Sequence, residues 1–307
     1  MKELAVIKNY RNDEALRHSF NELAKKTFWI DFEDWYQNGY WTDKYNPYSI
    51  VLDGKVVANV SVNQTDIAMT PEVARAMGLS EGTDAQERVL HYIQLGTVMT
   101  DEAYRGKGLS RRIMEEIMKD YPDADGMYLF GNDNVCEFYP KFGFCPVKHY
   151  EYVKEVHTAS EPTMKQVPMK ERADWDKLQA AIERSYHQSV FEMVNNSELN
   201  MFYVTKYMQD DVYFSEELDA YVIAEIEDGE LTVNMVISEK PQDMNRIVEG
   251  FGKEIRRAVL GFTPQDATGF ELREAEQVRE DCTFFVKGEG IARIAEAKVM
   301  FPLLAHA

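Results

Sequence analysis

Cysteine is scarce in this sequence, and long hydrophobic runs are missing. The 307 residues include three cysteines, Cys136, Cys145 and Cys282. Their odd number and their spacing make neither a disulfide framework nor a zinc site, so we expect a cytoplasmic protein without a metal. No run of about 18 apolar residues occurs, which argues against a transmembrane helix and a membrane partner. The segment 1–8 lacks the apolar stretch and the cleavage site of a signal peptide.

Basic residues are also few. Lys and Arg number 34 against 53 Asp and Glu, which gives a formal net charge of −19 at pH 7. This balance argues against a nucleic-acid partner, because phosphates require a basic face. It is compatible with the attraction of a cationic substrate such as an amine, or with solubility alone.

The sequence does contain a short glycine-rich turn, Arg105–Ser110, between a strand-like run, 92–100, and a helix-like run, 110–118. Glycines let several backbone N–H groups point into one concavity, and a helix N-terminus adds unpaired donors and a partial positive charge. Arg111 and Arg112 add charge in the first helical turn. We call Arg105–Ser110 the anion-binding turn, and it predicts a site for a phosphorylated ligand.

Two common nucleotide motifs do not fit this turn. The spacing Gly-x-x-x-x-Gly-Lys-Ser/Thr does not surround Lys107, so the turn is not a P-loop. A dinucleotide fingerprint needs a third glycine where Arg111 follows Gly106 and Gly108. Another class of phosphorylated ligand is therefore indicated.

The turn resembles the Arg/Gln-x-x-Gly-x-Gly/Ala signature of the GNAT superfamily of acyl-CoA-dependent N-acyltransferases. Arg105, Gly108 and Ser110 occupy its fixed positions. Serine departs from the commonest last residue, but it is small and its hydroxyl can cap the helix. The resemblance covers about residues 1–155.

A second stretch resembles the same family at the expected separation from the first. The strand-like run 126–131 is followed by Asn132, then by a short segment ending in Phe-Tyr139, and then by a Gly-Phe turn at Phe144. Either match alone would be weak, but their order and spacing agree.

The element pattern of the first half predicts an α/β fold, with a mixed sheet and helices on its faces. This is also the element order of the GNAT acyltransferase fold. The Asp53-Gly54 pair predicts a hairpin turn. The expected strands are 4–8, 48–52, 55–62, 92–100, 126–131 and 147–153, and the expected helices are 12–24 and 110–118.

The second half repeats this order, so we expect a second, degenerate GNAT-like α/β domain. The predicted division is an acetyl-CoA-binding domain at 1–156, a polar, proline-containing linker at 157–168 and the second domain at 169–307. The expected elements are helices at 171–193 and 243–257, a hairpin at 220–237, and strands at 201–204, 258–262 and 281–287.

The second half should not hold coenzyme A. Ser238–Asp243 stands where a second anion-binding turn belongs, with no glycine and Lys240 as its one basic residue. We therefore expect one active site per chain, with a second domain that can shape the acceptor site. The apolar segment 299–307 is either a last strand of the second domain or a dimer contact, so an oligomer remains open.

The resemblance implies acetyl-CoA as the co-substrate. Its pyrophosphate would lie on the backbone amides from Gly106 to Arg111, with Arg105 and Lys107 as supporting charges, although Lys107 is equally well explained as a solvated turn residue. Val98 to Thr100 resemble the place where the family's strand leaves its neighbour and pairs with the pantetheine arm. The predicted cofactor-binding residues are Val98, Met99, Thr100, Arg105, Gly106, Lys107, Gly108, Leu109, Ser110, Arg111 and Asn132.

Catalysis, by the same resemblance, falls to Tyr139 as the general acid that protonates the leaving thiolate, while a core packing role is its alternative. An amide of Val98 or Met99 would polarise the acetyl carbonyl. Asn132 would bind the pantetheine arm or cap a helix. No general base stands out: His91 alternates to the other face of its strand, so we favour a water relay.

The segment 28–48, between the first helix and the hairpin, is dense in aromatic rings and carboxylates. In this family it usually shapes the acceptor site, and such a mixture suits an organic cation. The alternative is that its rings pack a second helix onto the core. The predicted acceptor-binding residues are Asp31, Glu33, Trp35, Tyr36, Tyr40 and Trp41, with Asp34 and Asp43 as further charges.

Two classes of function therefore remain open. The first is an N-acetyltransferase that moves the acetyl group of acetyl-CoA to a primary amine of a small molecule or peptide by direct attack. The second is a non-catalytic acyl-CoA-binding or partner-docking protein. The complete Tyr139 segment favours the enzyme.

Overall fold

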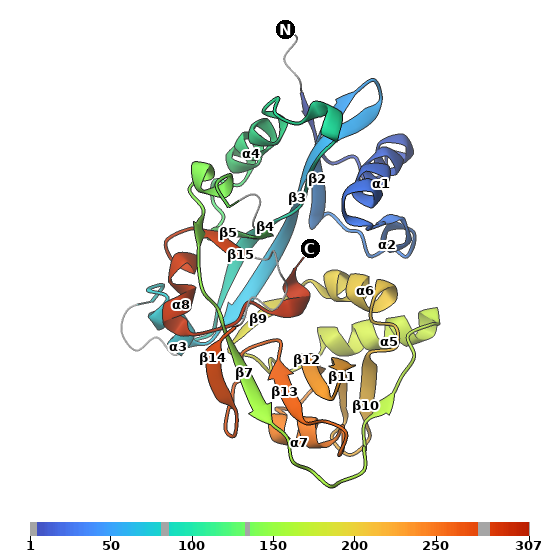
Figure 1. Ribbon diagram of the computed structural model, residues 1–307, viewed down its shortest axis with the longest axis vertical. Helices are drawn as coiled ribbons and strands as arrows, with labels where there is room; N and C mark the ends of the chain where they lie inside the picture. The colour runs from blue at the N-terminus through green and yellow to red at the C-terminus, as the bar shows by residue number, and fades with distance from the viewer. Residues whose placement is uncertain (1–4, 81–85, 133–135, 276–282, 307) are drawn as a thin grey trace.

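The computed structural model describes residues 5–80, 86–132, 136–275 and 283–306. The strands of this part of the chain form two mixed sheets, one above the other in Figure 1, with helices beside each. The expected α/β class is confirmed. No helix in the described residues is long and apolar enough to cross a membrane.

The first sheet has eight strands in the described part of the chain, in the order β1-β2-β3-β4-β5-β15-β6, and β9 pairs with β3. Neighbours are antiparallel except β4 and β5, which are parallel. Their bounds are β1 (Val6–Ile7), β2 (Tyr45–Leu52), β3 (Lys55–Met69), β4 (Arg88–Thr100), β5 (Gly126–Gly131), β6 (Cys145–Pro146), β9 (Phe191–Val194) and β15 (Thr283–Lys287).

Both expected hairpins form. Asp53 and Gly54 join β2 to β3 with φ of 49° and 75°, and Asp228 and Gly229 join the later hairpin with φ of 49° and 80°. Positive φ at both central residues is the requirement of a type I′ turn, which an Asp-Gly pair meets at low cost.

Helices cover both faces of the first sheet, as Figure 1 shows. The alternation along β3 separates the faces, because successive side chains point to opposite sides of a strand. Val60 and Val62 pack with Ile113 on the face of α4. The opposite face receives Phe20 of α1 and Trp35 of α2. The bounds are α1 (Glu14–Phe28), α2 (Glu33–Gln37), α3 (Pro71–Ala76) and α4 (Leu109–Asp120), with short 3₁₀ turns η1 (Glu102–Tyr104) and η3 (Tyr139–Phe142).

The second sheet has seven strands in the described residues, in the order β14-β7-β13-β12-β11-β10-β8. Its hairpin, β11–β12, is followed by α7 and by β13 parallel to β12, which repeats the hairpin, helix and parallel strand of the first half. The strands are β7 (Tyr150–Glu155), β8 (Lys165–Gln166), β10 (Val212–Ser215), β11 (Ala220–Glu227), β12 (Glu230–Ile237), β13 (Arg257–Leu260) and β14 (Glu271–Glu274). The helical elements of this half are α5 (Arg172–Glu183), α6 (Ser197–Lys206), α7 (Met244–Glu249), η4 (Ile291–Arg293), α8 (Ile294–Ala297) and η5 (Leu303–Ala305).

The two sheets exchange a strand. We expected the strand near 147–153 in the first sheet, but β7 pairs with β13 and β14 of the second. In return β15, expected in the second half, lies between β5 and β6 of the first sheet. Phe284, Phe285 and Val286 of β15 are all buried, as in a strand covered on both faces. The domain ranges 1–156 and 169–307 stay a prediction. Each of the two sheets contains strands from both halves of the chain.

Three further expectations of the second half are wrong. Residues 201–204 lie inside helix α6, because a short apolar run does not by itself distinguish a strand from a buried helix. The helix expected over 171–193 ends at Glu183, and residues 191–193 of that expected helix lie in strand β9. The helix expected over 243–257 ends at Glu249.

The C-terminal segment is neither a strand nor an exposed contact surface. Its described part ends in the short turn η5, and Val299, Phe301 and Leu304 are buried within the same chain. The Tyr128 hydroxyl donates to the carbonyl oxygen of Ala305 at 2.8 Å. The segment therefore completes the core between the two sheets.

The strand exchange predicts that residues 1–156 do not fold alone. This fragment lacks β15, which leaves β5 as an open edge, and it carries β7 without a partner. We expect the fragment to aggregate, whereas the full chain unfolds in one cooperative thermal transition followed by circular dichroism. A soluble fragment with its own sharp transition would contradict the prediction.

Candidate active site

A large cavity opens where β4 and β5 diverge. In the described strands the two pair in parallel over Tyr92–Gln94, and β4 continues to Thr100 without β5 beside it. The cavity has a volume of about 860 Å³, in the range of small-molecule sites. Ten of the predicted cofactor-binding residues line it: Val98, Met99, Thr100, Arg105, Gly106, Gly108, Leu109, Ser110, Arg111 and Asn132.

The anion-binding turn leads directly into α4, whose first residue is Leu109. Gly106 and Gly108 have φ of 73° and 75°, a left-handed conformation that glycine adopts without a steric penalty. The N–H groups of a first helical turn have no acceptor within the helix, so those after Gly108 can bind an anion. Arg105 reaches back to β4, where its Nε donates to the Thr100 carbonyl oxygen at 3.2 Å. The turn thus has the geometry of a pyrophosphate site.

Ser110 has a different role from the one we expected. The cap residue of α4 is Gly108, and no side chain caps the helix. The Ser110 hydroxyl instead lies 2.8 Å from the Thr100 hydroxyl oxygen. This bond joins the first turn of α4 to the end of β4 and fixes the two sides of the anion-binding turn relative to each other.

Lys107 does not belong to the described lining of the cavity. Its ammonium group donates to the Ala103 carbonyl oxygen at 2.9 Å and lies 4.6 Å from the centre of the Tyr104 ring. These contacts agree with the alternative that Lys107 is a solvated residue of the turn. The backbone amides then remain the main hydrogen-bond donors of the turn.

The segment of β4 beside the cavity is irregular. Asn59 of β3 pairs with Met99, whereas Ser61 pairs with Gly96, so Thr97 and Val98 lie opposite one residue of β3. Such a bulge bends a strand and redirects its backbone. It is located where we predicted amides that bind the pantetheine arm and the acetyl carbonyl.

Tyr139 lines the cavity from η3 and is only 4% exposed. Its ring contacts Phe138, Phe144 and Phe285, so Tyr139 also packs in the core, as the alternative to a catalytic role predicts. Burial raises the pKa of its phenol to about 12. The group is therefore protonated at neutral pH, as a proton donor must be. Gly131 leaves room for this ring, because an added Cβ would lie 2.9 Å from the Tyr139 Cε2.

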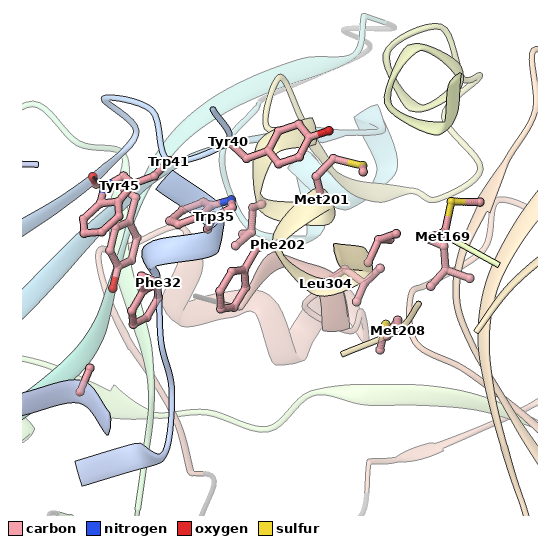
Figure 2. Close-up of a cluster of buried hydrophobic side chains, with 14 of the residues drawn as sticks. Phe32, Trp35, Tyr40, Trp41, Tyr45, Met169, Met201, Phe202, Met208 and Leu304 are labelled. Carbon is pink, nitrogen blue, oxygen red and sulfur yellow. Dashed lines mark hydrogen bonds between the residues drawn. The ribbon is translucent and has the colours of Figure 1, made fainter. Parts of the chain in front are cut away.

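The aromatic residues predicted to bind the acceptor lie in the core. Figure 2 shows Trp35, Tyr40 and Trp41 among buried side chains, and Phe202 of α6 lies beside them. The rings of Trp35 and Phe202 meet edge to face with centroids 5.2 Å apart. None of these rings is part of the described cavity lining. Their position supports the packing alternative, and the acceptor role stays an untested prediction.

The carboxylates of the same segment are paired within the chain. The guanidinium of Arg17 hydrogen-bonds to Glu33 and holds the pKa of that carboxyl below its usual value. The same guanidinium lies 3.8 Å from the centre of the Tyr36 ring. The other pairs are Asp31 with Lys25, Asp34 with Lys206 and Asp43 with Arg11. Among these pairs, Arg17–Glu33 joins α1 to α2 and Asp34–Lys206 joins α2 to α6.

Sequence reasoning missed several lining residues. Thr27 and Phe28 enter from the end of α1, and His306 enters from the C-terminal segment with its ring centroid 3.7 Å from that of Phe130. A sequence motif does not mark them, because they come from elements far apart in the chain. The other lining residues that we did not predict are Gln94, Leu95, Gly96, Thr97, Tyr104, Phe130, Gly131, Phe138 and Lys141.

His91 lies outside the described lining, and its Nδ1 is 2.9 Å from an Asp66 carboxylate oxygen. In the second half, α7 begins after Asp243, whose carboxylate accepts from the Asn245 N–H at 2.8 Å and so takes the place of an external anion. Within the described ranges, no cluster of three or more His, Cys, Asp and Glu side chains could hold a metal ion.

Comparisons with known proteins show what the chain resembles. The family model described as "Acetyltransferase (GNAT) family" matches residues 9–144. A search of curated proteins finds no match. The chain is similar to three solved structures, at identities that show the fold alone. They are a probable N-acyltransferase of unknown function from Enterococcus faecalis (12% identity, TM-score 0.60, 95% of this chain and 74% of that one), a GCN5-related N-acetyltransferase from Kribbella flavida (13%, 0.53, 95% and 73%) and Eis1 from Mycobacterium abscessus (8%, 0.54, 94% and 74%).

The left-handed conformation at the anion-binding turn predicts a selective effect of Gly108→Ala. A side chain at φ of 75° costs about 1–2 kcal/mol. If the turn relaxes to relieve this strain, its backbone amides no longer point toward the anion. We expect the affinity for coenzyme A, measured by calorimetry, to fall about tenfold. Gly54→Ala is the matched control, because Gly54 has the same φ and lies outside the cavity lining. Equal losses of affinity in the two variants would refute the assignment.

Proposed function

We propose that the protein is an N-acetyltransferase that moves the acetyl group of acetyl-CoA to a primary amine of a small molecule or peptide, because the acetyltransferase (GNAT) family model matches residues 9–144. The observation that carries this proposal is the cavity that joins the anion-binding turn, the bulged segment of β4 and Tyr139. These three parts correspond to the pyrophosphate, the thioester carbonyl and the leaving sulfur.

The residues of the cavity fit the donor. The amides after Gly108 hold the pyrophosphate, with Arg105 and Arg111 beside them, and the free edge of β4 pairs with the pantetheine amides as an added strand would. An amide of Val98 or Met99 donates to the carbonyl oxygen of the acetyl group. This donor matters most when negative charge develops on that oxygen.

The reaction is proposed as a direct transfer. The neutral amine attacks the acetyl carbon, a C–N bond forms, and the C–S bond breaks. Tyr139 gives its proton to the leaving sulfur, so that coenzyme A departs as a thiol. The amine loses its own proton to water in the cavity, and the phenolate of Tyr139 regains one from solvent.

The remaining lining is proposed to hold the acceptor. Thr27, Phe28 and His306 are available for this role once the turn, β4 and Tyr139 are assigned to acetyl-CoA. The ammonium group of Lys26 lies 2.9 Å from an Asp101 carboxylate oxygen, which attaches the end of α1 to the end of β4. Trp29 follows directly and is 92% exposed, so an aromatic surface is available next to this part of the lining.

Release of free thiol from acetyl-CoA over a panel of amines tests the proposed function. We expect at least one primary amine to stimulate release, with one coenzyme A site per chain by calorimetry. If water accepts the proton of the amine, the pH below which the rate falls should follow the pKa of the acceptor amine from one amine to the next. Binding of coenzyme A without stimulation by any amine would leave a binding protein and exclude the enzyme.

Tyr139→Phe tests the general acid. We expect kcat to fall about a hundredfold or more, while the dissociation constant of acetyl-CoA changes little, because the phenol acts on the departing sulfur. The phenol keeps its proton up to about pH 12, so the wild-type rate should show no loss from this group up to pH 10. Tyr92→Phe is the control: Tyr92 is fully buried outside the cavity, and its hydroxyl has no hydrogen-bond partner among the described residues. Parallel losses of kcat and affinity in Tyr139→Phe would indicate a packing role.

A further inference from the structure

Thr97 has an unusual backbone conformation at the centre of the site. Its φ is 42°, in the left-handed region, where β-branched residues are rare. Such a conformation persists when the surrounding structure imposes it, and it often accompanies function. Thr97 and Val98 form the bulge of β4, and both line the cavity.

Buried polar side chains of neighbouring strands hold Thr97 in this conformation. The Asn59 side-chain amide donates to the Thr97 carbonyl oxygen at 3.0 Å. The Thr97 hydroxyl donates to the Ser61 hydroxyl oxygen at 2.5 Å and lies 2.8 Å from the Tyr45 hydroxyl. Asn59 and Ser61 are fully buried, so the side chains that contact Thr97 from β3 are themselves fixed in the core.

The Asn59 amide is itself fixed in orientation. Its oxygen accepts from the Ser49 hydroxyl at 2.8 Å, and the Ser49 hydroxyl lies 2.7 Å from that of Tyr10. Its nitrogen also donates to the Ser61 hydroxyl oxygen at 2.9 Å. An amide held on both sides in this way cannot rotate to release the Thr97 carbonyl without leaving buried polar atoms unpaired.

We infer that Asn59 is a positioning residue for the acetyl transfer: by holding Thr97 in the left-handed conformation, it directs the Val98 or Met99 amide toward the thioester. Asn59 acts through Thr97 and is not part of the described cavity lining. Without the bulge, β4 would pair regularly with β3, and its register would shift by one residue beyond Gly96. The inference rests on the proposed function, because it assigns a role within that reaction.

Asn59→Ala tests the inference by its pattern of effects. We expect kcat to fall by at least about tenfold, since a misdirected oxyanion donor loses much of its effect, while the affinity for coenzyme A changes less than threefold. Thr97→Gly in the same chain should restore most of kcat, because glycine adopts a positive φ without the support of Asn59. A general loss of stability would not be reversed by this second change.

Asn46→Ala is the matched control. Asn46 is also a buried asparagine next to β3, and its amide is bonded to the backbone N–H and side chain of Asn9 at 2.9 and 2.7 Å. We expect this variant to lower the melting temperature and leave kcat unchanged. A kcat loss in Asn46→Ala as large as that in Asn59→Ala would overturn the inference, as would a double variant no better than Asn59→Ala.

A structural readout separates this inference from the proposed function. The ¹³Cα and ¹³Cβ chemical shifts of residue 97 report its backbone conformation without any substrate. In Asn59→Ala they should move toward extended values, and unchanged shifts would overturn the inference even if the wild type acetylates amines. If the alanine variant does not fold, Asn59→Ser carries the same test, because it keeps a polar group at this position but its shorter side chain cannot bond to Ser49 and the Thr97 carbonyl together.

Discussion

The site depends on one constraint, the point at which β4 stops pairing with β5. The parallel pairing ends at Gln94, and three residues later Thr97 takes a left-handed conformation that a buried amide holds. A regular sheet would close this gap with hydrogen bonds and leave no backbone free for a ligand. The divergence therefore creates the cavity, and the bulge lies along its lining. The anion-binding turn begins within ten residues of Thr97 and completes the proposed donor site.

The strand exchange supports the other wall of the cavity. β15 pairs with β5 over Thr283–Lys287, and its Phe285 ring contacts Tyr139. The C-terminal segment adds His306 to the lining. The proposed general acid and part of the proposed acceptor surface therefore depend on the second half of the chain, although the family match ends at residue 144. This arrangement gives the second half a structural role in the site without a second anion-binding turn.

The aromatic segment 28–48 shows where sequence reasoning reached its limit. Density of rings and carboxylates is typical both of a binding site for cations and of a packed junction, and composition alone does not separate the two. The structure buries Trp35 against Phe202, a residue more than 150 positions away, and stacks Trp41 on Trp35. The charges pair with cations of other helices. A long-range contact of this kind has no signal in the local sequence.

The sequence by itself determined the local elements of the proposed donor site. Glycines at 106 and 108, the helix after them and the Asp-Gly hairpins are set by backbone sterics within a few residues, so they were predictable. Only the tertiary structure decided that β7 and β15 change sheets, that 201–204 is helical, and that Ser110 bonds to Thr100 instead of capping α4. Each of these depends on which distant surface buries a given side chain, and burial is a property of the whole fold. The residues that we propose for the acceptor, Thr27, Phe28 and His306, likewise come together only in three dimensions.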